Sequence, residues 1–119
     1  MPTPREVSEA YWAAECHRDV DAVMEYYRPD ATYEDSGGLR RGDAEIRQAY
    51  EESARAYPGL EVRIVREFTG TPDSSALEFY AVLIDPAGRR FKVRGVNVVT
   101  VRDGKFVSVR SYEDAPNPE

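Results

Sequence analysis

Two adjacent carboxylates close the stretch YYRPDATYED, residues 26 to 35, and they are the first candidates for chemistry. The letters ATYED favour a short strand that runs into the turn SGG. Neighbouring side chains of a strand point to opposite faces, so Glu34 faces solvent if Asp35 faces inward. We therefore expect Asp35 to be a base in a pocket and Glu34 to be a surface residue. The alternative is that both carboxylates are solvated.

Polar side chains also fall on the core-facing parity of two later strands. In RGVNVVTVRDGKFVSVRSYED the core side is set by four valines, Val99, Val101, Val107 and Val109. The same parity carries three polar residues inward, namely Asn97, Ser111 and Glu113. A buried amide or carboxylate costs free energy unless it is hydrogen-bonded. The pattern predicts a lined cavity, unless the strand twists or bulges and exposes these residues.

Tyrosines are the third candidate group, because the chain has 8 of them. Tyr11, Tyr27 and Tyr50 fall on the apolar faces of three predicted helices. A buried tyrosine needs a partner for its hydroxyl group. Each of the three could be an ordinary core residue, but together with Asn97 and Asp35 they favour one shared pocket.

Three helices and a sheet must position these residues. The letters TPRE, residues 3 to 6, predict a capped helix start, and apolar spacing predicts a second helix from Asp19 to Pro29 and a third after Gly42. From Leu60 the period changes to two, which predicts a four-stranded antiparallel meander: LEVRIVREF, ALEFYAVLI, RFKVRGVNVVTV and KFVSVRSYED. We expect one α+β domain over residues 1–119, ordered over about 4–115, with a short loose C-terminal tail.

Composition narrows the partners. The chain is 119 residues long, with 41% hydrophobic and 32% charged residues, which is typical of one globular domain. The net charge of −6 argues against nucleic acid and anionic membranes. No signal peptide or membrane span is indicated, so we expect a cytoplasmic protein. Cys16 and His17 are the only residues of their types, which excludes an internal disulfide and argues against a zinc site. A small neutral or weakly polar ligand fits better.

The order of these motifs resembles the NTF2-like superfamily, in its SnoaL-like and ketosteroid-isomerase-like branch. The likeness rests on DxDAVxxYYxPDATYED, on the helix start GxxxI, and on RGVNV and RSYED, and it covers about residues 7 to 114. The resemblance implies a cone of curved sheet and three helices around one pocket, usually in a dimer. The superfamily includes hydrolases, dehydratases, cyclases, isomerases and non-enzymes.

Within this branch the sequence looks most like the steroid Δ5-isomerases. That resemblance implies Asp35 as general base and Tyr11 with Asn97 as the oxyanion hole, with Tyr27 and Tyr50 in support. Asp35 would remove a proton next to a ketone and return it along the conjugated system, through a dienolate held by the oxyanion hole. The reaction implied needs no metal and no cofactor.

The expected pocket also departs from those isomerases. Asn97 replaces an acid, and Glu113, with Ser111 beside it, stands where the family has an apolar wall. Val99 is expected to support the pocket. The implied ligand is a small hydrophobic or moderately polar molecule, steroid-like or polyketide-like, and the implied assembly is a homodimer through the sheet.

Two other classes stay open on the same cone. The first is a hydrolase, dehydratase or polyketide cyclase. An epoxide hydrolase would use Asp35 and Glu113 with an arginine, but Arg94 falls on the wrong parity. A cyclase would use an aspartate on the last strand, but Asp114 is predicted to face outward. The other is a non-catalytic ligand-binding or dimerisation domain. Its interface would use the apolar residues of the outer parity, Val98, Phe106 and Tyr112.

Overall fold

The helices begin where the capping residues predict. A computed structural model describes all of residues 1–119. Helix α1 (Pro4–Cys16) follows Thr3, whose hydroxyl accepts from the backbone N–H of Glu6, while the Glu6 carboxylate accepts from the backbone N–H of Thr3. Helix α2 (Val20–Met24) follows Asp19, whose side chain accepts a backbone N–H of the first turn. None of the helices is both long and apolar enough to cross a membrane.

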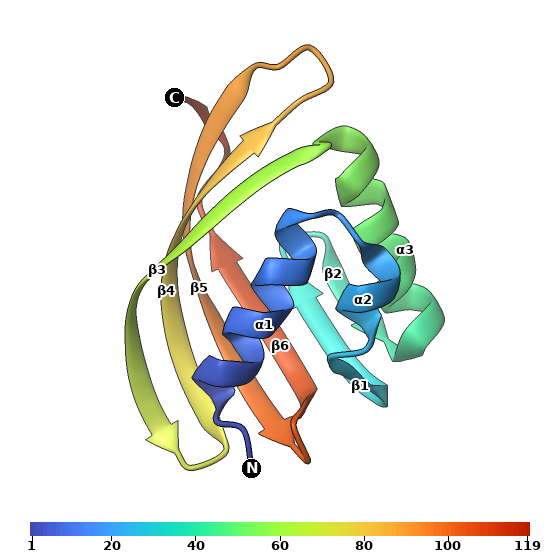
Figure 1. The fold of residues 1–119 in the computed structure, drawn as a ribbon, viewed down its shortest axis with the longest axis vertical. Helices are drawn as coiled ribbons and strands as arrows, with labels where there is room; N and C mark the ends of the chain where they lie inside the picture. The colour runs from blue at the N-terminus through green and yellow to red at the C-terminus, as the bar shows by residue number, and fades with distance from the viewer.

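One curved sheet and three helices make up the α+β fold. The third helix is α3 (Gly42–Ala56), and the strands are β1 (Tyr27–Asp35), β2 (Gly38–Arg41), β3 (Gly59–Thr71), β4 (Ser74–Ile84), β5 (Arg90–Arg102), β6 (Lys105–Glu113) and β7 (Asn117–Pro118). The sheet order is β2-β1-β6-β5-β4-β3, with β7 beside β5. Strands β3 to β6 form the predicted antiparallel meander. Figure 1 shows all three helices on one side of this curved sheet, which confirms the predicted cone.

The first strand starts earlier than the sequence suggests. Helix α2 ends at Met24, and Pro29 lies inside β1 instead of ending a helix. Strand β1 runs parallel to β6, and the register of this pair is interrupted between Tyr27 and Thr32. Because the ladder is broken there, the missing N–H of Pro29 costs no hydrogen bond. Tyr27 is therefore the first residue of a strand, and its predicted position on a helix is wrong.

A β-bulge corrects the predicted parity of β6. Thr100 pairs with Ser108 but Val101 pairs with Phe106, so Val107 is an extra residue on β6. One extra residue reverses which side chains face the core. Phe106 is buried and Val107 only partly so. The core position predicted for Val107 and the outer-face position predicted for Phe106 are therefore wrong.

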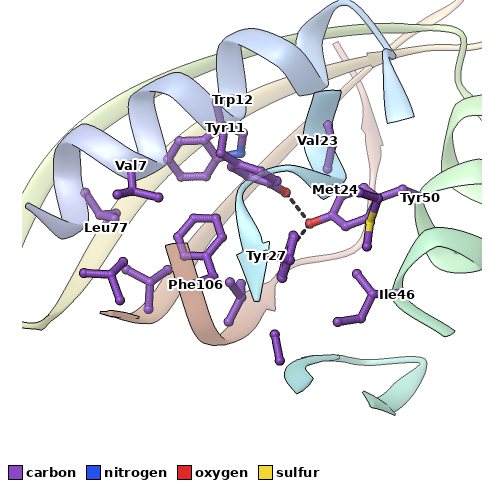
Figure 2. Packing of buried hydrophobic residues seen from close by; sticks show 14 of the residues in the cluster. Val7, Tyr11, Trp12, Val23, Met24, Tyr27, Ile46, Tyr50, Leu77 and Phe106 are labelled. Atoms are coloured by element: carbon purple, nitrogen blue, oxygen red, sulfur yellow. Dashed lines mark hydrogen bonds between the residues drawn. The ribbon is translucent and has the colours of Figure 1, made fainter. Parts of the chain in front are cut away.

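Aromatic rings fill the core between α1 and the sheet, as Figure 2 shows. The ring of Tyr11 lies 5.3 Å from that of Phe106, and the ring of Trp12 lies 5.3 Å from that of Phe79, measured between centroids. Val99 is buried in the same cluster. Close packing of this kind fixes the face of α1 that the sheet covers.

The C-terminal residues differ from the loose tail expected from the sequence. Asn117 pairs with Lys92 and Pro118 with Phe91, which makes the short strand β7. The Glu119 carboxylate also accepts from Nε of Arg90 at 2.6 Å. The tail thus runs along β5, close to where the chain leaves the β4–β5 hairpin.

Candidate functional site

A cavity of about 250 Å³ lies between the helices and the sheet. Strands β1 to β6 and helices α1 and α3 all contribute to its wall. Most of the residues predicted for the site line this one space: Tyr11, Asp35, Tyr50, Asn97, Ser111 and Glu113. Tyr27 and Val99 are buried behind the wall and do not line it.

Three tyrosine hydroxyls form a hydrogen-bonded chain, drawn as dashed lines in Figure 2. The Tyr50 hydroxyl lies 2.6 Å from the Tyr11 hydroxyl and 2.6 Å from the Tyr27 hydroxyl. Burial is the main cause that raises the pKa of all three well above the usual tyrosine value. The hydroxyls are therefore neutral at pH 7. Since each has one hydrogen and the chain has two bonds, one hydrogen is left to donate elsewhere.

Asp35 ends β1 with one oxygen occupied and one free. Its Oδ1 accepts from the backbone N–H of Gly37 at 2.8 Å and from Nη1 of Arg40. Neither bond uses Oδ2. The Tyr33 hydroxyl also lies near this carboxylate: burial, and after it nearby charges and a hydrogen bond with Asp35, raise the Tyr33 pKa. Glu34 is exposed, as the opposite parity predicts.

Sequence reasoning missed Arg40, because it placed a turn but no second strand after Asp35. In the β1–β2 hairpin Arg40 lies opposite Tyr33, and Asp35 lies opposite Gly38. Tyr33, Asp35 and Arg40 therefore share one face, and Arg40 reaches Asp35 along the diagonal. Recognising a hairpin around Ser36 and Gly37 would have found this ion pair.

Tyr33 is a second omission, and its signal was available. It lies two residues before Asp35, so it shares the inward face. Its ring stacks on that of Tyr50, with centroids 5.4 Å apart and planes 17° apart, and the Arg40 guanidinium lies 5.8 Å from the Tyr33 ring centroid. Tyr33 thus connects the tyrosine chain to the Asp35 and Arg40 pair.

Strands β5 and β6 bring the polar residues inward. Asn97 pairs with Ser111, and Gly95 with Glu113. Asn97 is 5% exposed and its Oδ1 has no hydrogen-bond partner. Glu113, which was also predicted to face inward, is exposed at the cavity rim. Partial burial of its carboxyl group and the charges of Asp35 and Asp114 raise its pKa. An unpaired buried amide and a carboxyl group with a raised pKa are typical of a ligand site.

A buried ion pair between Glu15 and Arg18 also lines the cavity, and sequence reasoning missed it. Glu15 lies one helical turn after Tyr11, a spacing that places both on one face of α1. Its Oε1 accepts from Nη1 of Arg18 at 3.0 Å, and the two side chains are 8% and 9% exposed. Burial raises the Glu15 pKa to about 7, although the guanidinium opposes the shift. The helical spacing from Tyr11 was a usable signal.

Arg94 and Asp114 face away from the cavity, as their parity predicts. The Asp114 carboxylate accepts from the backbone N–H of Arg94 at 2.9 Å and from its Nε at 3.3 Å. The Arg94 side chain is 80% exposed. The arginine of this cavity that contacts Asp35 is Arg40.

Comparison with known proteins agrees with this geometry. The sequence matches the model of the SnoaL-like domain over residues 8–109. It is 26% identical to the structure of SalBIII, an epoxide hydrolase/cyclase-like enzyme in pyran ring formation in the polyether salinomycin, with 92% of this chain and 89% of that chain covered and a TM-score of 0.80. It is also 26% identical to an M. tuberculosis LEH-like epoxide hydrolase, with 91% and 80% covered and a TM-score of 0.77.

A third similar structure is an isomerase. The Δ5-3-ketosteroid isomerase from Mycobacterium sp. is 22% identical, with 93% of both chains covered and a TM-score of 0.81, which is a likeness of fold. A search of the curated proteins finds no match. Because the family model spans the chain from α1 to β6, including the strands and helices that build the cavity, the protein belongs to the SnoaL-like domain family.

Proposed function

We propose that this protein is a cofactor-independent enzyme that shifts a carbon–carbon double bond in a small unsaturated ketone, as ketosteroid isomerases do. The observation that carries the proposal is the tyrosine hydroxyl chain, which ends at Tyr11 in the cavity that Asp35 also lines. A neutral donor and a carboxylate in one cavity are what enolisation next to a ketone requires.

The donor side of the site is the oxyanion hole. If Tyr27 donates to Tyr50 and Tyr50 to Tyr11, the remaining hydrogen of Tyr11 is directed to the ligand carbonyl. A hydroxyl that already accepts a hydrogen bond is a stronger donor. Asn97 supplies the second contact through the N–H donors of its Nδ2. Its buried Oδ1 is an acceptor and gains no partner from a ketone.

The base side is Asp35. Its free Oδ2 takes a proton from the carbon between the ketone and the alkene, the electron pair of that C–H bond forms the dienolate, and the same carboxyl group returns the proton at the far carbon. Arg40 and the Gly37 N–H hold Oδ1 and fix the direction of the carboxylate.

The cavity limits the ligand. Its volume of about 250 Å³ is below the range of roughly 300–1,000 Å³ for pockets of drug-sized ligands. Ser111 and Glu113 make one side polar. A ketone smaller than a four-ring steroid, of one or two rings or of polyketide type, fits this space better.

One observation favours a second candidate, epoxide opening by water or by a hydroxyl group of the substrate. The ion pair of Asp35 with Arg40 supplies the arginine that Arg94 does not, and Glu113 has a raised pKa. Asp35 would then take a proton from the attacking oxygen, and the acid form of Glu113 would give one to the epoxide oxygen. In the net reaction one C–O bond of the epoxide breaks, the attacking oxygen bonds to that carbon, and the epoxide oxygen takes up a proton.

The test compares a β,γ-unsaturated bicyclic ketone and an epoxide as substrates. For the isomerase, Asp35→Asn lowers kcat by about 10²- to 10⁴-fold, whereas Glu34→Gln, the exposed neighbour, is the unchanged control. Arg40→Met separates the candidates: isomerisation continues, because Asp35 and its bond from the Gly37 N–H remain, whereas epoxide opening falls. Enone formation no faster than in buffer would remove the isomerase proposal.

Assembly and location remain predictions in the same proposal. Val98 and Tyr112 lie on the outer parity of the sheet, and Tyr112 is 56% exposed, which supports a homodimer through this face. Sedimentation of the wild type and of Tyr112→Ser would test it. A cytoplasmic location stays a prediction from the sequence.

A further inference from the structure

We propose that Glu15 and Arg18 form a second polar subsite of the cavity, which accepts a hydroxyl group of the ligand. The isomerase proposal uses neither residue. The subsite itself stands on the geometry around Glu15, whereas the conclusion that the substrate is a hydroxy ketone also rests on the proposed function.

The free oxygen of Glu15 is the acceptor. Arg18 donates to Oε1 and leaves Oε2 without a partner in the protein. The only fully buried side-chain polar atoms without a partner are Ser8 Oγ and Asn97 Oδ1. Glu15 Oε2 also has no partner, but it is not one of these fully buried atoms. Since Glu15 is otherwise buried and lines the cavity, this oxygen is accessible from the cavity.

Arg18 makes the subsite rigid. Its Nε donates to the carbonyl oxygen of Tyr57 at 2.9 Å, and its Nη2 donates to the carbonyl and the hydroxyl oxygens of Ser53, both at 3.2 Å. These contacts tie the end of α1 to the end of α3. The Arg18 backbone has a φ of +55°, which is unfavourable for a residue with a side chain and is offset by these contacts.

Charge selects a hydroxyl group over the alternatives. The ionised Glu15 and Arg18 together are neutral, so the pair offers an accepting oxygen without attracting a cation. Most donors of the guanidinium are used by the protein, so a ligand carbonyl or carboxylate finds few of them free. A neutral donor such as an alcohol satisfies Oε2 best.

The spacing sets where the hydroxyl group lies on the ligand. Four residues of α-helix separate Tyr11 and Glu15, which is about 6 Å along the axis. A ketone whose oxygen binds Tyr11 therefore carries its hydroxyl group on another part of the ligand, remote from the ketone. The ligand class is a compact hydroxy ketone.

One histidine, His17, lies two residues from Glu15 and is exposed. Few other ionisable groups surround Glu15. Arg18 is the only charged group that shifts its pKa. The tyrosines near it stay neutral because burial raises their pKa, and burial also raises the pKa of the Cys16 thiol on the same helix. The sheet faces the cavity near α1 with apolar residues, Leu60, Val62, Phe79 and Ala81. The other ionisable side chains of the cavity are Tyr33, Asp35, Arg40, Tyr57 and Glu113.

Fluorescence of Trp12, the one tryptophan, reports binding because it lines the cavity. The probes are a hexahydronaphthalenone, a bicyclic enone that cannot isomerise further, and its analogue with one hydroxyl group on the ring remote from the ketone. We expect the hydroxylated probe to bind about tenfold more tightly at pH 8.5, as for a hydrogen bond to a charged acceptor. At pH 5.5 the preference falls, because Glu15 is protonated. Effects of pH that act equally on both probes cancel in the ratio of their two dissociation constants.

The matched variants are Glu15→Gln and, on the exposed side of α1, Glu9→Gln. Glu15→Gln should remove the preference and its pH dependence, whereas Glu9→Gln should keep both. Carbon-13 NMR of the glutamate carboxyl groups in the wild type gives a measurement that needs no variant: the hydroxylated probe alone should lower the pKa of Glu15.

Several outcomes would overturn the subsite. They are equal binding of the two probes, absence of binding by the hydroxylated probe, a preference that survives in Glu15→Gln, and a preference that grows as the pH falls. Failure of the isomerase proposal looks different: enone formation is absent, yet the hydroxyl preference is present.

Discussion

Removing the hydroxyl group in the middle of the tyrosine chain should destabilise the protein more than removing one at its end. Tyr50→Phe breaks both 2.6 Å hydrogen bonds. The Tyr11 hydroxyl can still bond water in the cavity, but the Tyr27 hydroxyl lies behind the wall and loses its one hydrogen bond of normal length, so that only the more distant Tyr11 hydroxyl is left near it. Tyr27→Phe breaks one hydrogen bond and leaves no buried hydroxyl group without a partner, because Tyr50 still bonds to Tyr11.

The magnitudes follow from these contacts. A typical hydrogen bond contributes about 0.5–1.5 kcal/mol net, and a stranded buried polar group costs about 1–3 kcal/mol. Tyr27→Phe should therefore cost about 0.5–1.5 kcal/mol and Tyr50→Phe about 2–4 kcal/mol. The double variant should be no less stable than Tyr50→Phe alone, because it removes the stranded hydroxyl group as well.

Urea unfolding followed by circular dichroism measures these differences. With a slope of about 1–3 kcal/mol per molar urea, Tyr50→Phe should shift the midpoint by about 1 M or more. Tyr11→Phe is the informative comparison, since it should lose enone formation at a small cost in stability. Equal destabilisation by Tyr50→Phe and Tyr27→Phe, or additive costs in the double variant, would refute the hydroxyl chain.

Three further predictions concern the strands and α1. Gly95→Ala should cost about 1–3 kcal/mol of unfolding free energy, because a Cβ there would lie 2.8 Å from the backbone oxygen of Tyr112. Gly70→Ala is the control in the same urea assay, because the nearest neighbour of a Cβ there is at 3.4 Å. Phe106→Ala should cost about 3–5 kcal/mol. Phe68→Ala, which removes an exposed ring, should cost under about 1 kcal/mol; similar costs would contradict the burial of Phe106 that the bulge produces. Glu15 binds its proton more tightly in the folded state, so the wild type should lose stability relative to Glu15→Gln as pH rises from about 5 to about 7.5, by at most roughly 3 kcal/mol for a pKa near 7. Parallel stability curves of the two proteins would contradict the burial of Glu15.

The helix starts and the meander could be predicted because their signals are local. Thr3 and Glu6 satisfy each other's backbone within one turn, and the alternation in β4 and β5 follows directly from burial on one face. Alternation also correctly placed Asn97 of β5 and Ser111 of β6 inward. These inferences needed no knowledge of which strands are neighbours.

Prediction failed where a residue's position depends on a partner strand. The parity of Phe106 reverses because β6 has one residue more than β5 at the bulge, and no pattern in KFVSV shows it. Tyr27 belongs to a strand because it pairs with β6, which lies far from it in the sequence. Arg40 meets Asp35 only because a two-residue turn folds β2 back onto β1. Each error comes from pairing geometry, which the sequence of one strand does not contain.

The arginines explain how an acidic protein maintains a cavity for an uncharged ligand. Three carboxyl groups line the cavity, and two of them are neutralised, Asp35 by Arg40 and Glu15 by Arg18. The third, Glu113, has a raised pKa and lies at the rim. An anionic ligand would meet Glu113 without a free cationic partner, and a cationic ligand would approach an arginine beside each buried carboxylate. Neutral ketones, alcohols and epoxides avoid both penalties, so the ligand search should begin with them.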